Sequence, residues 1–84
     1  MSAARAALSR TKLFGEALQS RINGLTTDFV NRDDPAQRTV IEQDRMKAVS
    51  ELDRVKKDIE DQTKAIADIE EEARRAGVPP GWLR

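Results

Sequence analysis

Hydroxyl, carboxylate and basic side chains are the reactive groups that this sequence offers. The chain has no His and no Cys, so the usual base at neutral pH and the thiolate nucleophile are both absent. A serine hydroxyl therefore has no partner that could activate it for attack. The serines are Ser2, Ser9, Ser20 and Ser50. The sequence predicts no catalytic residue, and we expect a protein that is not an enzyme.

Metal, nucleotide and nucleic-acid binding are also not expected. No acidic cluster has the spacing of a calcium loop, and the glycines do not form a phosphate-binding loop. The glycines are Gly15, Gly24, Gly77 and Gly81. The basic residues are spread out, the net charge is +0, and two Phe and one Trp are too few for base stacking. We expect no metal, no cofactor, no small-molecule substrate and no nucleic-acid partner.

The elements that could position a binding surface are helices. The chain is 38% hydrophobic and 36% charged, with 15 basic and 15 acidic residues, a composition typical of long helices and coiled coils. Its 84 residues make one small domain, which is marginally stable unless it assembles. No apolar run approaches the roughly 20 residues of a membrane span.

The first fifteen residues, MSAARAALSRTKLFG, are basic. They contain Arg5, Arg10 and Lys12, and no acidic residue precedes Glu16. This is also the composition of a mitochondrial presequence. We interpret it instead as the basic first half of a helix. We expect a cytoplasmic protein without a cleavable signal peptide, and leave open secretion by another route.

The clearest helix boundaries lie in the second half of the chain. Asp34 is a favourable N-cap, Pro35 follows at the first helical position, and Gln37 completes a capping-box pattern. At the other end, Gly77 can adopt the left-handed conformation that ends a helix. These signals predict a helix over about 35–76.

Heptads run along this helix. Nine of its eleven a and d residues are apolar, which predicts a narrow line of contact with another helix, and the exceptions are Arg45 and Gln62. A polar residue at such a position often fixes the register of two helices. The a positions hold Arg45, Leu52, Ile59, Ile66 and Ala73, and the d positions hold Ile41, Ala48, Val55, Gln62, Ile69 and Ala76.

A second amphipathic pattern precedes this helix. Its predicted core face is Ala7, Thr11, Phe14, Leu18, Ile22, Leu25 and Phe29. Gly15 and the Asn23-Gly24 pair lie inside it, and Asn-Gly is a turn signal. The helix either runs from about 3 to 30 or stops near residue 23. The unbroken phase of the apolar face favours the continuous helix.

Two helices joined by a short loop at about 31–34 are expected to fold back on each other. The sequence thus predicts an all-α, antiparallel two-helix hairpin of the coiled-coil type with unequal arms. The hairpin would span residues 1–76, and residues 77–84 would form a tail.

Charge favours the antiparallel arrangement. Residues 1–32 carry five basic and two acidic side chains, net +3, and residues 33–84 carry ten basic and thirteen acidic, net −3. Arg5, Arg10 and Lys12 are therefore expected to lie opposite the acidic residues Asp53, Asp58, Glu60 and Asp61. Each exposed pair contributes little on its own.

The longer helix leaves about its last dozen residues without a partner in the hairpin. An apolar line without a cover is an interaction surface, so we expect copies to assemble into a helical bundle or another protein to cover it. The predicted interface seam is Leu52, Val55, Ile59, Ile66, Ile69 and Ala73. Residues 58–72 are also acidic, with seven acids and one lysine, and form either a solvated face or a docking site for a basic partner.

The tail, GVPPGWLR, contains the one Trp of the chain behind two prolines. An indole on a stiff segment loses little entropy on docking, and Trp is enriched in interface hot spots. The tail either folds back on the helix end or docks on a partner. The predicted docking residues are Val78, Pro79, Pro80, Trp82 and Leu83.

These features predict a protein–protein interaction module that self-associates, docks a partner, or does both. In size and hairpin outline the chain is similar to the small secreted hairpins of the WXG100 family, which would imply a carrier or chaperone that escorts a larger effector. Its inter-helix segment, NRDDPAQ, has no Trp-x-Gly and its tail has no Tyr, so no residue role is transferred. An antitoxin-like regulatory binder is a further alternative.

Overall fold

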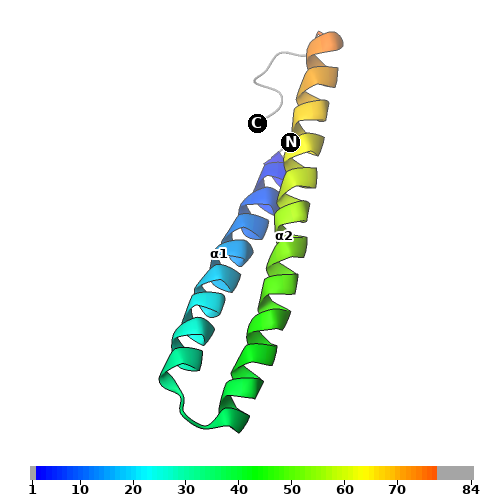
Figure 1. Cartoon of the computed structure of the whole chain (residues 1–84). Helices are drawn as coiled ribbons and strands as arrows, with labels where there is room; N and C mark the ends of the chain where they lie inside the picture. The colour runs from blue at the N-terminus through cyan, green and yellow to red at the C-terminus, as the bar shows by residue number, and fades with distance from the viewer. Residues whose placement is uncertain (1, 78–84) are drawn as a thin grey trace.

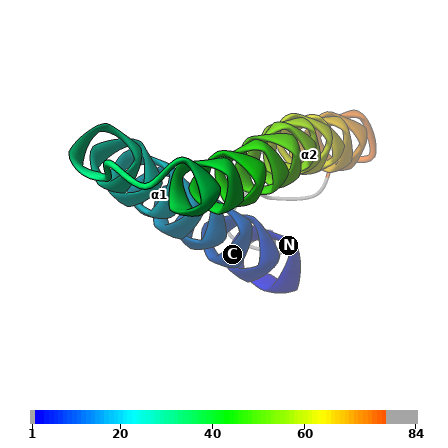
Figure 2. The same cartoon turned by 60° about the horizontal axis from the view of Figure 1, so that its bottom comes forward.

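A computed structural model describes residues 2–77 of the chain. It is an antiparallel hairpin of two helices, α1 (Ser2–Asn31) and α2 (Pro35–Arg75), joined by a loop at 32–34 (Figure 1). The principal extents are 64 × 16 × 14 Å. Viewed from the loop end, the helices cross at an angle (Figure 2). The predicted all-α hairpin with unequal arms is confirmed.

The loop ends where α2 is capped. Asp34 is extended, with φ −72° and ψ 117°, and its carboxylate accepts a hydrogen bond from the Ala36 backbone N–H at 2.9 Å. The Asp34 carbonyl accepts the first helical bond, from Arg38, at 3.0 Å. The predicted N-cap is therefore confirmed. The carboxylate bonds the second helical residue, whereas the capping-box pattern predicted the third, Gln37.

The last turn of α2 is closed by Gly77, whose φ is +75°. The Gly77 N–H donates to the Arg74 carbonyl at 3.1 Å, and the Ala76 N–H donates to the Glu72 carbonyl at 3.0 Å. These bonds satisfy carbonyls that the helix end would otherwise leave free. Glycine adopts the left-handed conformation at no steric cost, which explains why the helix ends here.

Helix α1 passes through Asn23 and Gly24 without a break, as the continuous interpretation predicted. The Asn23 side chain accepts a hydrogen bond from Gln19 at 3.1 Å, one turn earlier. Gly24 costs the helix about 1 kcal/mol relative to alanine. Burial of Ile22 before this pair and partial burial of Leu25 and Phe29 after it keep the helix intact.

The core lies in the middle of the hairpin. Among the described residues, the hydrophobic side chains that are less than one-tenth exposed are Leu18, Ile22, Ala48, Leu52 and Val55. Val49 and Ile59 pack against this cluster. Gly15 is also buried between the helices. A core of this size is small for a free-standing domain.

Candidate interaction surface

The face that α1 turns toward α2 follows strict heptad spacing. Its buried and half-buried residues are Ala4, Leu8, Thr11, Gly15, Leu18, Ile22, Leu25 and Phe29, with steps that alternate between four and three residues. Ala7 is half-buried beside this line. The prediction that Phe14 belongs to the core face is wrong, because its side chain is 49% exposed. The alternation of four and three was the signal that could have identified Gly15 and Leu8.

Gly15 is buried because the two helices approach closely at this position. A Cβ atom placed there would lie 3.3 Å from Val55 Cγ1 and within 4 Å of Ile59 and Leu52. This distance is shorter than ordinary van der Waals contact, so even a methyl group would need Val55 to move. The sequence placed Gly15 inside the first helix without a role, and its missing side chain is what allows α2 to pack here.

The predicted interface seam of α2 is divided by the structure. Leu52 and Val55 are buried against α1, so they belong to the core of the hairpin itself. Ile59, Ile66 and Ala73 are half-buried. Ile69 is 44% exposed. The line of contact therefore weakens toward the C-terminal end of α2.

The polar residues of the heptad line behave differently from one another. Arg45 is exposed and reaches across to α1, where its Nε donates to the Thr26 hydroxyl oxygen at 2.9 Å. Asp44, not Arg45, takes the half-buried position. Gln62 is half-buried, and its Oε1 atom is shielded from solvent without a hydrogen-bond partner. A shielded carbonyl without a partner costs about 1–3 kcal/mol.

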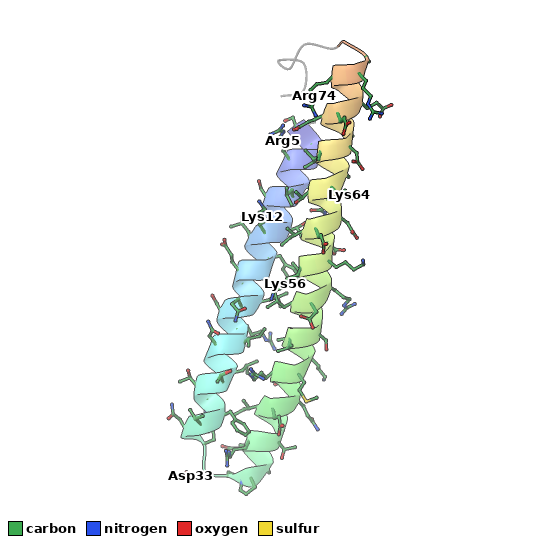
Figure 3. The ribbon with its side chains drawn as sticks, turned by 45° about the horizontal axis from the view of Figure 1, so that its top comes forward. Arg5, Lys12, Asp33, Lys56, Lys64 and Arg74 are labelled. Carbon is green, nitrogen blue, oxygen red and sulfur yellow. The ribbon has the colours of Figure 1, made fainter. Side chains whose placement is uncertain are left out.

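The charge register differs from the prediction. Arg5 pairs with Glu70, so Arg5 does not lie opposite the predicted acidic stretch at 53–61. The Arg5 side chain lies near the start of α1, and Lys64 projects from α2 on the side away from α1 (Figure 3). The prediction placed the centre of the hairpin at residue 32 and ignored the reach of these long side chains.

The overhang of α2 is consequently shorter than the expected dozen residues. Helix α2 has 41 residues and α1 has 30, and α2 continues past the start of α1 (Figure 1). Side chains of α1 nevertheless reach as far as Glu70. The acidic residues of 58–72 other than Glu70 are exposed, and Glu71 pairs with Arg75 in the next turn at 2.9 Å.

One side of the hairpin, here called the Phe14 face, collects exposed apolar side chains from both helices. A groove lined by Arg21, Asp44, Lys47, Ala48 and Glu51 marks this side. Residues separated by whole helical turns lie on the same side of a helix. Phe14 lies two turns before Arg21 on α1 and so shares its side. Ile69 lies 18 residues, or about five turns, after Glu51 on α2 and shares the side of Glu51. Val40, 57% exposed, lies 11 residues before Glu51 and thus on the same side.

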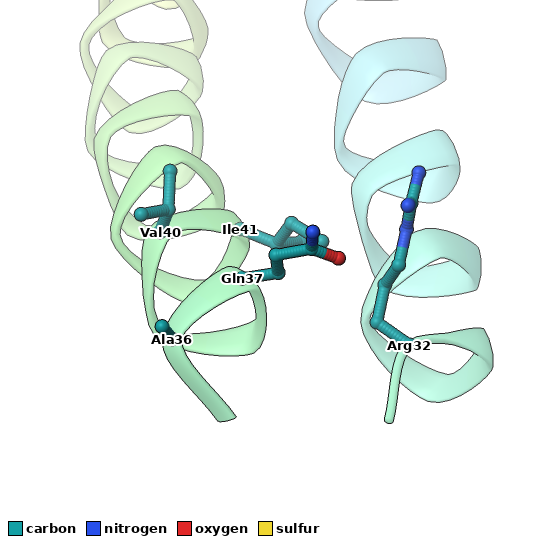
Figure 4. Close-up of a pocket in the computed structure, with 5 residues that line it drawn as sticks. All are labelled: Arg32, Ala36, Gln37, Val40 and Ile41. Atoms are coloured by element: carbon teal, nitrogen blue, oxygen red, sulfur yellow. The ribbon is translucent and has the colours of Figure 1, made fainter. Parts of the chain in front are cut away.

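An apolar groove extends the Phe14 face toward the loop. It is lined by Arg32, Ala36, Gln37, Val40 and Ile41 (Figure 4). Gln37 and Ile41 point from α2 toward α1, while Ala36 and Val40 lie on the outer part of α2 (Figure 4). On the other side of this end, the Arg38 guanidinium lies over the Phe29 ring, 4.3 Å from its centroid.

The opposite side, here called the Lys12 face, is rimmed by polar and charged groups. A groove there is lined by Lys12, Glu16, Gln19 and Lys56 above Gly15, Leu52 and Ile59. Gly15 leaves this hollow, and two lysines stand at its edge. Phe14, Val40 and Ile69 lie on the other side. The Lys12 face carries one large exposed apolar side chain of its own, Val30, which is 68% exposed and lies 18 residues or about five turns after Lys12.

Three predictions, on the tail, on metal binding and on a membrane span, can be compared only with residues 2–77. Val78, Pro79, Pro80, Trp82 and Leu83, the predicted docking residues, lie outside residues 2–77. Within 2–77 no group of three or more acidic residues is arranged to hold a metal ion. Neither helix in that range has an apolar stretch long enough to cross a bilayer.

Comparison with known proteins found no relative of this chain. No protein-family model, no curated protein and no solved structure matches the chain.

Proposed function

We propose that the chain is a non-enzymatic protein–protein interaction module. It is a hairpin that self-associates, docks a partner, or does both, and it uses the apolar surface that its two helices leave uncovered. The end of α2 and the Trp-containing tail supply further docking contacts. The carrier and antitoxin-like alternatives would use the same surface and differ in the partner that covers it.

The disproportion between core and surface carries this proposal. Five hydrophobic side chains are buried among the described residues, while six large ones are 44–68% exposed. The accessible surface is 6413 Å², whereas a compact monomer of this mass exposes about 5,000 Å². The radius of gyration is 19.0 Å, against about 12 Å for a compact domain of this length. Association reduces such an excess of surface.

The test is the light-scattering mass of the whole chain at several concentrations, beside a version that ends at Ala76. We expect the whole chain to form an oligomer or to capture a specific partner from its own cell extract. An unchanged mass after truncation would assign assembly to the hairpin and leave the tail for another protein. A monomeric truncated chain would make the tail the clasp between copies. A monomer that captures nothing, with or without the tail, would contradict the proposed function.

A further inference from the structure

We infer that the occupant of the Phe14 face is a second copy of the chain, packed with its loop at the same end. This inference rests on the proposed function and specifies its partner and geometry. The two hairpins form a four-helix bundle whose two-fold axis runs parallel to the helices. Each α1 then packs against the α2 of its partner.

The apolar content of the Phe14 face is the first reason. Phe14, Val40 and Ile69 are 49%, 57% and 44% exposed, and they spread from the open end of the hairpin to the loop. Only a partner as long as the hairpin can cover all three at once. Another hairpin of the same length meets this requirement, whereas a short peptide in the loop groove would leave Phe14 and Ile69 in water.

Charge decides how the second copy is oriented. On the Phe14 face, α1 carries Arg10 and Arg21, which are 11 residues or about three turns apart. The same face of α2 carries Asp44 and Glu51, and Asp58 follows two turns later. Asp28 on α1, and Lys47 and Arg54 on α2, have the opposite signs to their neighbours, which leaves two bases against one acid on α1 and three acids against two bases on α2. The predominant charge of the face is thus positive on α1 and negative on α2.

Loops at the same end match these charges. In that arrangement the two copies are level with each other along the bundle. Each segment of α1 therefore packs against the same segment of α2 twice, once in its own chain and once in the partner. Arg21 would then lie near acids of both chains, since Asp44 and Glu51 already line its own groove. Loops at opposite ends, with the same faces in contact, would place α2 on α2 and set the acidic lines against each other, which is unfavourable.

The elongated hairpin has surface that association can remove. The surface of 6413 Å² exceeds that of a compact monomer by about 1,400 Å². A standard interface removes about 800 Å² from each partner. All neighbouring helices in the resulting bundle are antiparallel, which is the arrangement of up-and-down four-helix bundles.

The first experiment compares two substitutions of adjacent exposed residues by light scattering and analytical ultracentrifugation. Phe14→Glu is expected to raise the dissociation constant of the dimer at least about tenfold. Leu13→Glu is the matched control. Leu13 is 65% exposed and lies two residues from both Thr11 and Gly15, so it points away from α2 and from the Phe14 face. Circular dichroism should show that both variants remain helical.

The second experiment measures the orientation. The chain has no cysteine, so Asp33→Cys in the loop allows one spin label per chain. Loops at the same end predict a label-to-label distance below about 30 Å, because packed helices are about 8–10 Å apart. Loops at opposite ends predict a distance close to the 64 Å length of the hairpin.

The outcomes separate this inference from the proposed function. A monomer, an equal loss of association in Leu13→Glu, or a distance close to the molecular length would each overturn the inference. Any of them leaves the proposed function standing if the chain still associates in another way or captures a specific partner. A monomer that captures no partner overturns both.

Discussion

The middle of the hairpin and its open end are built from different side chains, although the same two helices form both. In the middle, Gly15, Leu18, Ile22, Leu52 and Val55 are buried and interlock. At the open end, α1 contributes Ala4, Leu8 and Thr11, which are only half-buried. The facing part of α2 is half-buried too, and it includes Gln62, whose carbonyl oxygen has no partner. An ion pair, Arg5–Glu70, closes this end.

This contrast indicates which region of the hairpin contributes most to the free energy of unfolding. Burial of large apolar side chains stabilises the middle, and each contributes about 1.5–3 kcal/mol. The open end buries smaller or partly exposed groups, so it contributes less and is the part freer to exchange its contacts for those of a partner. Substitutions in the two regions should therefore change the free energy of unfolding by different amounts. All comparisons belong at one protein concentration, because association would add to stability.

The largest effect is expected for Leu52→Ala in the middle. It removes a buried side chain from a core of five and should lower the free energy of unfolding by about 2–4 kcal/mol. Ile66→Ala, the matched truncation at the half-buried open end, should cost about half as much. Urea melts followed by circular dichroism measure both. Equal costs would mean that the open end is packed as firmly as the middle.

A smaller effect is expected where the helices touch at Gly15. Gly15→Val adds atoms where a Cβ would already lie 3.3 Å from Val55, and should cost about 1–3 kcal/mol. Gly24 has open space around it and is helical, so Gly24→Ala should stabilise by about 0.5–1 kcal/mol. Thermal melts should show a lower melting temperature for Gly15→Val and a higher one for Gly24→Ala. A stabilising Gly15→Val would refute the close approach.

Gln62→Met would make the open end resemble the middle. The substitution keeps the length of the side chain and removes the shielded carbonyl that has no partner, and so should raise the free energy of unfolding by about 1 kcal/mol. Chemical denaturation detects this gain. Gln43→Met, on an exposed position of the same helix, is the control and should be nearly neutral. A loss of stability in Gln62→Met would mean that the amide has a partner in solution.

The smallest effect is expected for Arg5→Ala. The pair with Glu70 is formed by side chains that are 56% and 37% exposed, and such pairs contribute between zero and about 1 kcal/mol. The effect should shrink in 1 M salt, which screens charges beyond about 3 Å. Double-mutant cycles with Glu70→Ala at low and high salt measure it. A coupling that does not change with salt would place the pair in a more shielded site than its exposure indicates.

Local chemistry made the ends of α2 predictable. Asp34 before the helix, Pro35 at its first position and Gly77 after it act through their own backbone geometry. Predicting them needs no knowledge of the partner helix. The heptad line of α2 likewise identified Leu52 and Val55, because nine apolar residues at regular spacing leave one face to bury. The antiparallel hairpin followed from these features and a predicted loop of about four residues, which the structure shortens to residues 32–34.

The contact face of α1 was harder to predict because two adjacent lines of the helix are both apolar. Ranking by side-chain size favours Phe14, but the helices are close enough that a glycine, Gly15, fits and a phenylalanine does not. The distance between the two helix backbones depends on the side chains of both helices. The apolar pattern of one helix alone therefore cannot predict it. For the same reason the Phe14 face could not be identified: it became visible only once the side of α2 next to Arg21 was known.

Helix α2 also fixes a distance. Its interior has no glycine, and its one proline stands at the first position, so nothing along its 41 residues provides a hinge. At 1.5 Å per residue the helix is about 60 Å long. Whatever lies in the groove beside Val40 is held about that far from whatever follows Gly77. The hairpin is therefore a rigid spacer as well as a surface, and shortening α2 by whole heptads would shift the separation of its two ends in steps of about 10 Å while keeping each contact on its face.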